Sequence, residues 1–342
     1  MEAIVDRVQT LLDYKDLFIT EYPVGLESHV EDIIKCIENQ TTKVCKIIIW
    51  GMGGSGKTTI AKAIYNRIYR LFIGKSFIEN ISEVCDPDNN EYVDLQRHLL
   101  FGVLKSLFDV ESIGMGKTMI ENELSPKKLL IVLDDLNKLG QFENVCGNCG
   151  WLGEGSLIII TTRDVHVLNG LKVNYVYKMD GMNENDSLEL LSWHAFSEGK
   201  LRRDLDYLAR NIVAYCRGVP LALKLLGSFL CDRTLDEWER ISSKLNRTPM
   251  YHVEGILDIC FDGLEATEKE IFLELCCFYI GKERGYASDI LNAYGLDADI
   301  GITVLIERGL IKVESDNKLE MDPLLQHMGK EISRERGLKK LG

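Results

Sequence analysis

Apolar residues come in short runs between about Lys46 and Tyr177, and these runs alternate with segments of helical periodicity. Four runs rich in β-branched or aliphatic residues predict strands, at residues 46–50, 76–78, 129–133 and 157–161. Between the first two, apolar residues recur every three or four positions and predict one apolar helix face, formed by Ile60, Ile64, Ile68 and Leu71. This alternation is typical of βαβ units around a parallel sheet that is covered on both faces. The pattern predicts an α/β domain.

The strand patterns fade after Asn183. Residues 187–230 are helical by pattern, with a break at residues 218–220, and the rest of the chain to Lys330 is mostly helical with a short hairpin between Leu310 and Met321. At about 150 residues per domain, 342 residues suggest two or three domains. We therefore expect an α/β domain followed by helical ones.

The net charge and the cysteine content disfavour several classes of function. The chain has 40 Lys and Arg against 53 Asp and Glu, and this net charge of −13 disfavours a non-specific nucleic-acid binder or a generic binder of anionic membranes. Secretion and membrane spanning are disfavoured because the sequence has neither a signal-peptide pattern nor about 18 consecutive uncharged apolar residues. Ten scattered cysteines suit a reducing compartment, the cytosol or nucleus. The single CxxC, Cys146 and Cys149, has no second pair, so we expect a loop there.

One glycine-rich segment carries a phosphate-binding motif. Residues 51–58 read Gly51-Met52-Gly53-Gly54-Ser55-Gly56-Lys57-Thr58 and match GxxxxGK[ST] between a predicted strand and a predicted helix. The glycines let successive backbone N–H groups surround phosphate oxygens at the start of the helix. Lys57 would reach the terminal phosphates, and the Thr58 hydroxyl would bind Mg²⁺. The segment predicts a P-loop.

Two other glycine patterns need separate interpretations. Residues 51–56 also spell the dinucleotide-binding pattern GxGxxG, and Glu79 follows the next predicted strand where a ribose-binding acid would stand. Lys57 and Thr58 favour the P-loop, but the dinucleotide alternative stays open. Residues 114–118 resemble the end of a second P-loop, yet no strand precedes them and Glu111 replaces the first glycine. We expect these residues to lie on the surface.

Charged residues follow two of the predicted strands. The run 129–133 ends in Asp134 and Asp135, which would stand at the carboxyl edge of the sheet, facing the nucleotide of a P-loop protein. Asp134 would hold Mg²⁺, and Asp135 could orient an attacking water. The next strand ends in residues 161–164, which place the guanidinium of Arg163 at the same edge, where its donors suit a terminal phosphate.

Together, these motifs resemble the NB-ARC module of plant nucleotide-binding leucine-rich-repeat disease-resistance proteins, which is akin to animal apoptotic ATPases. The order of the motifs is specific to this module and covers nearly the whole chain. Beyond the P-loop, the matching segments are residues 130–135, 155–164, 218–223, 272–280 and 321–326. Asn137, after the paired aspartates, resembles the subclass that carries an N-terminal TIR domain.

The resemblance implies a P-loop NTPase parallel sheet followed by a helical domain and a winged-helix-like domain. The implied parts are a linker helix at residues 1–20, the P-loop domain at 21–180, the helical domain at 181–250 and the winged-helix-like domain at 251–342. It also implies an ADP-bound off state and an ATP-bound on state that forms a homo-oligomer in defence signalling. Hydrolysis would be slow or incidental. The alternatives are an efficient P-loop ATPase and a degenerate or truncated receptor copy.

The resemblance also assigns residues and partners. Phosphates and Mg²⁺ would be held by residues from Gly53 to Thr59, and Arg163 would sense the terminal phosphate. Pro220 would lie against the adenine, with Val24 and Gly25 contributing to the base pocket. TIR and leucine-rich-repeat domains are expected in a full-length receptor, which would act in the cytoplasm, with the nucleus as a second location, and would not bind nucleic acid directly.

The sequence departs from the family pattern at two positions. The family motif Met-His-Asp reads Met321-Asp322-Pro323 here, so a carboxylate replaces the imidazole expected near the ADP β-phosphate. A carboxylate would repel phosphate, which leads to the hypothesis that this chain retains ADP weakly; a degenerate, non-signalling copy is the alternative. Ser82 replaces a frequently basic position of the family, with no predicted effect.

Overall fold

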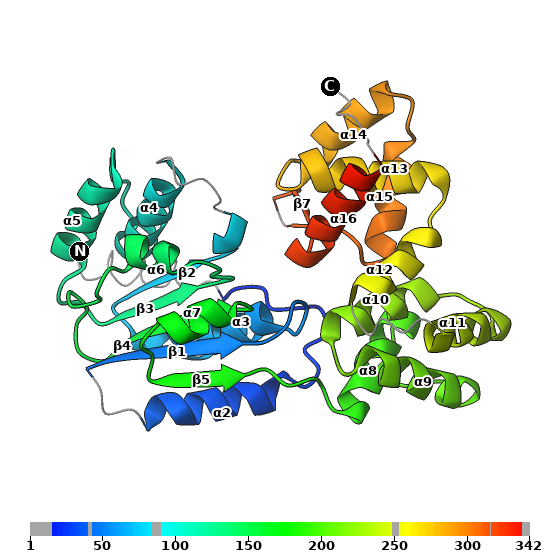
Figure 1. The fold of residues 1–342 in the computed structure, drawn as a ribbon, viewed down its shortest axis with the longest axis horizontal. Coiled ribbons are helices and arrows are strands. Elements are labelled where there is room, and N and C mark those ends of the chain that lie inside the picture. Colours follow the sequence, from blue (N-terminus) through cyan, green and yellow to red (C-terminus); the bar gives the residue numbers. More distant parts are fainter. Residues whose placement is uncertain (1–15, 40–42, 84–89, 248–252, 315, 337–342) are drawn as a thin grey trace, which may run out of the picture. The chain divides into compact units, whose positions relative to one another are not determined.

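The computed structural model describes residues 16–39, 43–83, 90–247, 253–314 and 316–336. The chain divides into two compact units (Figure 1). The first combines Met1–Met52 with Gly56–Asp180, and the second combines Gly53–Ser55 with Gly181–Gly342.

The first unit is built on a five-stranded parallel sheet with the order β2-β3-β4-β1-β5. Its strands are β1 (Val44–Trp50), β2 (Gly74–Ile78), β3 (Leu129–Leu133), β4 (Ser156–Thr162) and β5 (Tyr175–Lys178). The four predicted strands are confirmed, and β5 is an additional one. Because β5 has only four residues of partly exposed character at the edge of the sheet, it shows no continuous apolar run.

The strand order excludes the dinucleotide alternative. In a dinucleotide-binding fold, the strand before the glycine loop lies beside the next strand along the chain. Here β1 lies between β4 and β5, and β2 lies at the far edge beside β3. Glu79, the candidate ribose ligand, instead forms an ion pair of 2.8 Å with Lys62. The hydride-transfer interpretation is therefore wrong.

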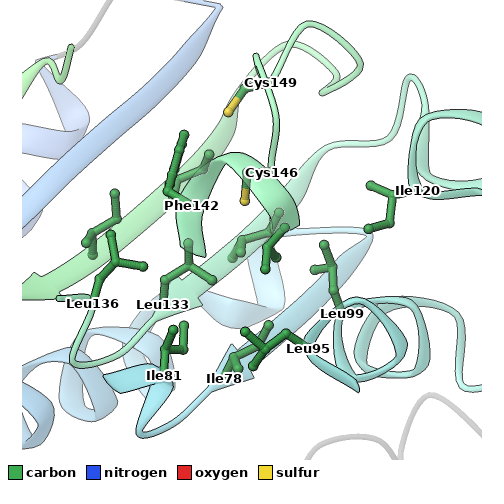
Figure 2. Close-up of a cluster of buried hydrophobic side chains, with 14 of the residues drawn as sticks. Ile78, Ile81, Leu95, Leu99, Ile120, Leu133, Leu136, Phe142, Cys146 and Cys149 are labelled. Carbon is green, nitrogen blue, oxygen red and sulfur yellow. The ribbon is translucent and has the colours of Figure 1, made fainter. Parts of the chain in front are cut away.

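Helices cover both faces of this sheet because alternate residues of each strand point to opposite sides. On one face, Ile47 and Ile49 pack with α2 (Leu26–Glu38) and α3 (Lys57–Ile68). On the other, Ile48 and Leu133 belong to a cluster with four helices (Figure 2). These helices are α4 (Asn90–Leu104), α5 (Ile113–Leu124), α6 (Leu139–Val145) and α7 (Val165–Gly170).

The apolar cluster that contains Ile48 and Leu133 also explains two sequence features outside the P-loop. Cys146 and Cys149 are buried among its apolar side chains (Figure 2), which is typical of cysteines that act as small apolar residues. Residues 114–118 lie in α5, where a Cβ on Gly116 would stand only 1.9 Å from the Gln96 side chain. Gly116 is thus a packing position. The expectation that the segment lies on the surface is wrong for Gly116 alone, because the other four residues are exposed or partly exposed.

The second unit is mainly helical. Its helices are α8 (Glu184–Phe196), η3 (Arg203–Leu205), α9 (Asp206–Cys216), α10 (Pro220–Leu230), α11 (Leu235–Arg247), α12 (Val253–Asp262), α13 (Ala266–Glu274), η4 (Leu275–Tyr279), α14 (Arg284–Ala293), α15 (Ala298–Glu307) and α16 (Pro323–Glu335). Strands β6 (Lys312–Val313) and β7 (Leu319–Glu320) pair antiparallel. The hairpin predicted between Leu310 and Met321 is therefore confirmed.

The N-terminal linker prediction falls largely outside the described residues. Residues 16–20 form no regular element, so a helix does not extend through residue 20 as expected. Leu17 is tied to α3 instead, because its N–H donates to Asn66 Oδ1 at 2.9 Å and its carbonyl accepts from Asn66 Nδ2 at 2.7 Å. None of the helices in the described ranges is long and apolar enough to cross a bilayer.

Candidate phosphate-binding site

The glycine-rich loop joins the end of β1 directly to the start of α3, as its motif requires. Gly54 and Gly56 have φ angles of 72° and 89°, in the left-handed region that residues with a Cβ rarely adopt. Gly56 is the residue immediately before α3, so the loop leads into the positive end of the helix dipole. This geometry suits an anion that is bound by backbone N–H groups.

Polar side chains of the loop lie within it rather than in solvent. Lys57 is only 7% exposed, and its Nζ donates to the Met52 carbonyl at 2.8 Å, so the ammonium lies over its own loop. The Ser55 hydroxyl is buried and has no hydrogen-bond partner among the described residues. A buried hydroxyl without a partner is rare in folded proteins and fits a loop shaped for a polar ligand.

Thr58 and Asp134 lie in contact at the carboxyl edge of the sheet. Thr58 Oγ1 lies 2.9 Å and 3.1 Å from the two carboxylate oxygens of Asp134. The Thr161 hydroxyl donates to Asp134 Oδ1 at 2.6 Å. Burial raises the pKa of the Asp134 carboxyl above its usual value, against the lowering effect of these two hydrogen bonds. A hydroxyl and a carboxylate in contact are oxygen ligands of the kind that Mg²⁺ prefers.

Asp135 forms an ion pair with Arg163. Arg163 Nη2 lies 3.0 Å from Asp135 Oδ2, and Arg163 Nε lies 3.3 Å from Oδ1. The Ser82 hydroxyl also donates to Oδ2. Burial alone would raise the pKa of the Asp135 carboxyl, but the hydrogen bonds from Arg163 and Ser82 and the Arg163 charge outweigh it and lower that pKa. The carboxylate is therefore held ionised beside Arg163.

The backbone of Asp135 supports this arrangement. Its φ of 54° is unusual for a residue with a Cβ, and its N–H donates to Thr161 Oγ1 at 2.8 Å. The hydroxyl of Thr161 thus connects the two aspartates, since it also donates to Asp134. Neither this link nor the contact of Ser82 was predicted from the sequence, because a motif marks a position without showing which side chains meet there. Polar residues at the ends of buried strands were the available signal.

Of the remaining predicted site residues, Gly51 follows strand β1, and Val24, Gly25 and Thr59 lie at or next to helix starts. Gly51 donates its N–H to the Thr162 carbonyl at 3.3 Å, and Thr59 lies in the first turn of α3. Gly25 has a φ of 70° and caps the start of α2, where it follows the partly buried Val24. No described hydrogen bond assigns Val24 or Gly25 to a base pocket, so that role stays a prediction.

Pro220 and Asp322 belong to the second unit, and each begins a helix there. Pro220 is the first residue of α10 and follows Gly218, which has a φ of 71°. Asp322 caps α16: its Oδ1 accepts from the Leu324 N–H at 2.9 Å, and Pro323 is the first helical residue. An aspartate cap followed by proline is a favourable helix start. Asp322 thus has a structural role that the motif comparison missed.

A parallel sheet, a glycine loop that enters a helix, and an acidic edge beside that loop define a P-loop NTPase fold. Comparison with protein families specifies the class further. The NB-ARC domain model matches residues 26–200, and the model described as "Disease resistance protein Roq1-like, winged-helix domain" matches residues 265–337. The chain belongs to the NB-ARC family. The predicted resemblance to the NB-ARC module and the predicted fold class are confirmed. Membership of this family implies nucleotide binding.

Similar proteins support this assignment. The chain is 40% identical to disease resistance protein RUN1 of Vitis rotundifolia over 98% of its own length and 25% of that protein. It is 34% identical to TMV resistance protein N of Nicotiana glutinosa over 97% of its length and 29% of that protein. The chain thus spans about a quarter of the length of these relatives.

A solved structure supports the fold alone. The structure of a Signal Transduction ATPase with Numerous Domains (STAND) protein with a tetratricopeptide repeat sensor, from Pyrococcus horikoshii, matches with a TM-score of 0.56 and 16% identity. The match covers 93% of this chain and 44% of that one.

Proposed function

We propose that this chain is the ADP/ATP-binding switch of a plant intracellular immune receptor, with an ADP-bound off state and an ATP-bound, homo-oligomeric on state. The single observation that carries the proposal is the edge of the sheet at which the loop of Lys57, the Thr58–Asp134 contact and the Asp135–Arg163 pair occur together. A site that distinguishes two nucleotides can bias two conformations only if it binds them unequally in the two states.

The residues of the first unit suit defined roles. Backbone N–H groups of residues 53–59 and the Lys57 ammonium would bind the phosphates. Thr58 and Asp134 would hold Mg²⁺, which would neutralise charge on the phosphate oxygens when bound. Asp135 would orient a water, and Arg163 would contact the terminal phosphate of ATP.

Slow hydrolysis follows from the position of Asp135. Both of its oxygens accept hydrogen bonds from Arg163, and one of them also accepts from Ser82. A carboxylate bound in this way is poorly placed to accept a proton from water. When Arg163 turns to the terminal phosphate of ATP, Oδ2 would still accept from Ser82, so Asp135 would remain a restricted base. An efficient ATPase is the second candidate, and steady-state turnover at saturating Mg-ATP separates the two: the switch predicts turnover far below the ~10 s⁻¹ that is typical of enzymes.

The second unit would sense which nucleotide is bound. We propose a P-loop domain at 21–180, a helical domain at 181–250 that places Pro220 against adenine together with Val24 and Gly25, and a winged-helix-like domain at 251–342 that places Asp322 near the β-phosphate. The length of the relatives supports TIR and leucine-rich-repeat domains as further parts of the receptor, which would act in the cytoplasm or nucleus.

The nucleotide that purifies with the protein tests this proposal. Denaturing the purified chain and separating the supernatant by anion exchange should release ADP. An empty site in folded protein would contradict the switch and favour the degenerate copy.

A further inference from the structure

Ser82 occupies a fixed position beside the acidic edge. It lies in the short helix η2 (Ile81–Glu83), directly after β2. The Ile81 N–H donates to the Asp134 carbonyl at 3.0 Å, and Gln141 Nε2 donates to the Ile81 carbonyl at 3.0 Å. Both of these contacts are independent of Arg163. The Ser82 hydroxyl is thus attached to the end of β3 and to α6 whether or not Arg163 stays in place.

Ser82 and Arg163 share one acceptor. Asp135 Oδ2 accepts from the Ser82 hydroxyl and, at 3.0 Å, from Arg163 Nη2. The Asp135 side chain is 11% exposed, whereas the Arg163 side chain is 37% exposed. The aspartate is therefore the buried member of the pair, and the arginine is the member with access to solvent and to a ligand.

Binding of the γ-phosphate of ATP would weaken the ion pair of Asp135 and Arg163. The proposed contact of Arg163 with ATP takes donors away from Asp135, and it would leave a nearly buried carboxylate that has lost its charged partner. ADP lacks the γ-phosphate, so it would leave the pair of Asp135 and Arg163 in place. A neutral donor that stays on the carboxylate gains strength when the arginine leaves, because hydrogen bonds to an unpaired charge are the stronger ones.

We propose that Ser82 is a positioning residue for the triphosphate-bound site: it holds the Asp135 carboxylate when Arg163 turns to the terminal phosphate. This inference rests on the proposed nucleotide switch and deepens it. Ser82 lowers the cost of separating Arg163 from Asp135, and thereby favours ATP relative to ADP.

The test compares nucleotide preference rather than activity. Calorimetric titrations of the full chain with Mg-ADP and with a non-hydrolysable Mg-ATP analogue give the ratio of the two affinities. Ser82→Ala should weaken binding of the ATP analogue by about five- to tenfold, which is the scale of the net contribution of one hydrogen bond. Binding of ADP should change by less than about twofold, and Ser82→Thr, which keeps the hydroxyl, should restore the wild-type ratio.

A double-mutant cycle separates positioning from a general structural effect. In an Asp135→Asn background the carboxylate charge is gone, so Ser82→Ala should no longer change the ratio. Equal weakening of both nucleotides by Ser82→Ala, no change in either, or the same change in the Asp135→Asn background would overturn the inference. Wild-type protein that binds neither nucleotide would instead overturn the proposed function itself.

Discussion

Asp322 has an observed structural role and a proposed role in ligand binding. Its carboxylate caps α16, whereas the motif comparison places it near a phosphate that it would repel. Asp322→Ala should lower the free energy of unfolding by about 1 kcal/mol, because the Leu324 N–H loses its acceptor. Asp322→Asn keeps the cap without the charge and should leave stability nearly unchanged. Urea unfolding of the three proteins measures this difference.

Asp322→Asn, together with Asp322→His, tests the hypothesis of weak ADP retention. If the carboxylate repels phosphate, Asp322→Asn and Asp322→His should both bind ADP more tightly than the wild type. Equal ADP affinities across the three proteins would refute electrostatic repulsion at this position and leave Asp322 as a helix cap only.

At the residue scale, sequence patterns indicated which residue types stand at the candidate site, but not which of these residues contact one another. The P-loop motif predicted the position of Lys57 and Thr58 because glycine, lysine and hydroxyl each have a defined physical task there. The contact between Ser82 and Asp135 joins residues 53 positions apart. Such a contact depends on where η2 packs, which no local pattern encodes.

At the scale of single elements, α5 offers a matched pair of glycines. A Cβ on Gly116 would meet Gln96, which is fully buried and donates to the carbonyls of Ile113 and Asn144 at 3.0 Å and 2.7 Å. Gly116→Ala should therefore lower the free energy of unfolding by about 1–3 kcal/mol through overpacking. Gly114→Ala, with nothing within 4 Å, should raise it by about 0.5–1 kcal/mol through helix propensity. Thermal unfolding of both variants measures the difference, and equal effects would contradict this packing.

A histidine in α8 gives the second unit a pH-dependent stability. Burial lowers the pKa of His194 to about 4, and the charges of Lys224 and Lys312 contribute to the shift. The unfolded chain titrates near pH 6.5, so this contribution is fully present above that pH and is lost as the pH falls from 6.5 towards 4. The loss should reach at most about 3 kcal/mol.

Urea unfolding between pH 7 and pH 4.5 tests this prediction. His194→Gln should flatten the decline of stability across that range. The control is His327→Gln, because His327 is a surface residue with 65% of its side chain exposed, and it should retain the wild-type decline. Identical profiles for the wild type and His194→Gln would contradict the prediction.

A strand could be predicted from the sequence where all of its residues are buried to a similar extent. Strands β3 and β4 are buried along their entire length; β3 reads as a continuous apolar run, and β4 contains one at residues 157–160. The edge strand β5 alternates between partly buried and exposed residues, and it was missed. Likewise, the packing of Gly116 against Gln96 could not be predicted, because it depends on how α4 and α5 meet.

At the scale of the whole molecule, the sequence specified the class through the order of its motifs. The sheet order then removed the dinucleotide alternative, which composition and spacing had left open. Sequence reasoning could not supply this order, because the crossover from β1 to β2 depends on packing between distant segments. In the proposed switch, a nucleotide that binds only the folded chain stabilises the folded state by mass action.

Titration calorimetry of the folded chain with Mg-ADP and Mg-ATP tests the central claim most directly, with Lys57→Ala as the comparison. The account predicts saturable heats for both nucleotides in the wild type, and a loss of affinity of at least about tenfold in Lys57→Ala, because that variant lacks the charge nearest the phosphates. Circular dichroism should show the same helix content in both proteins. No heat with either nucleotide in folded wild-type protein, or the same affinity in Lys57→Ala, would contradict the account.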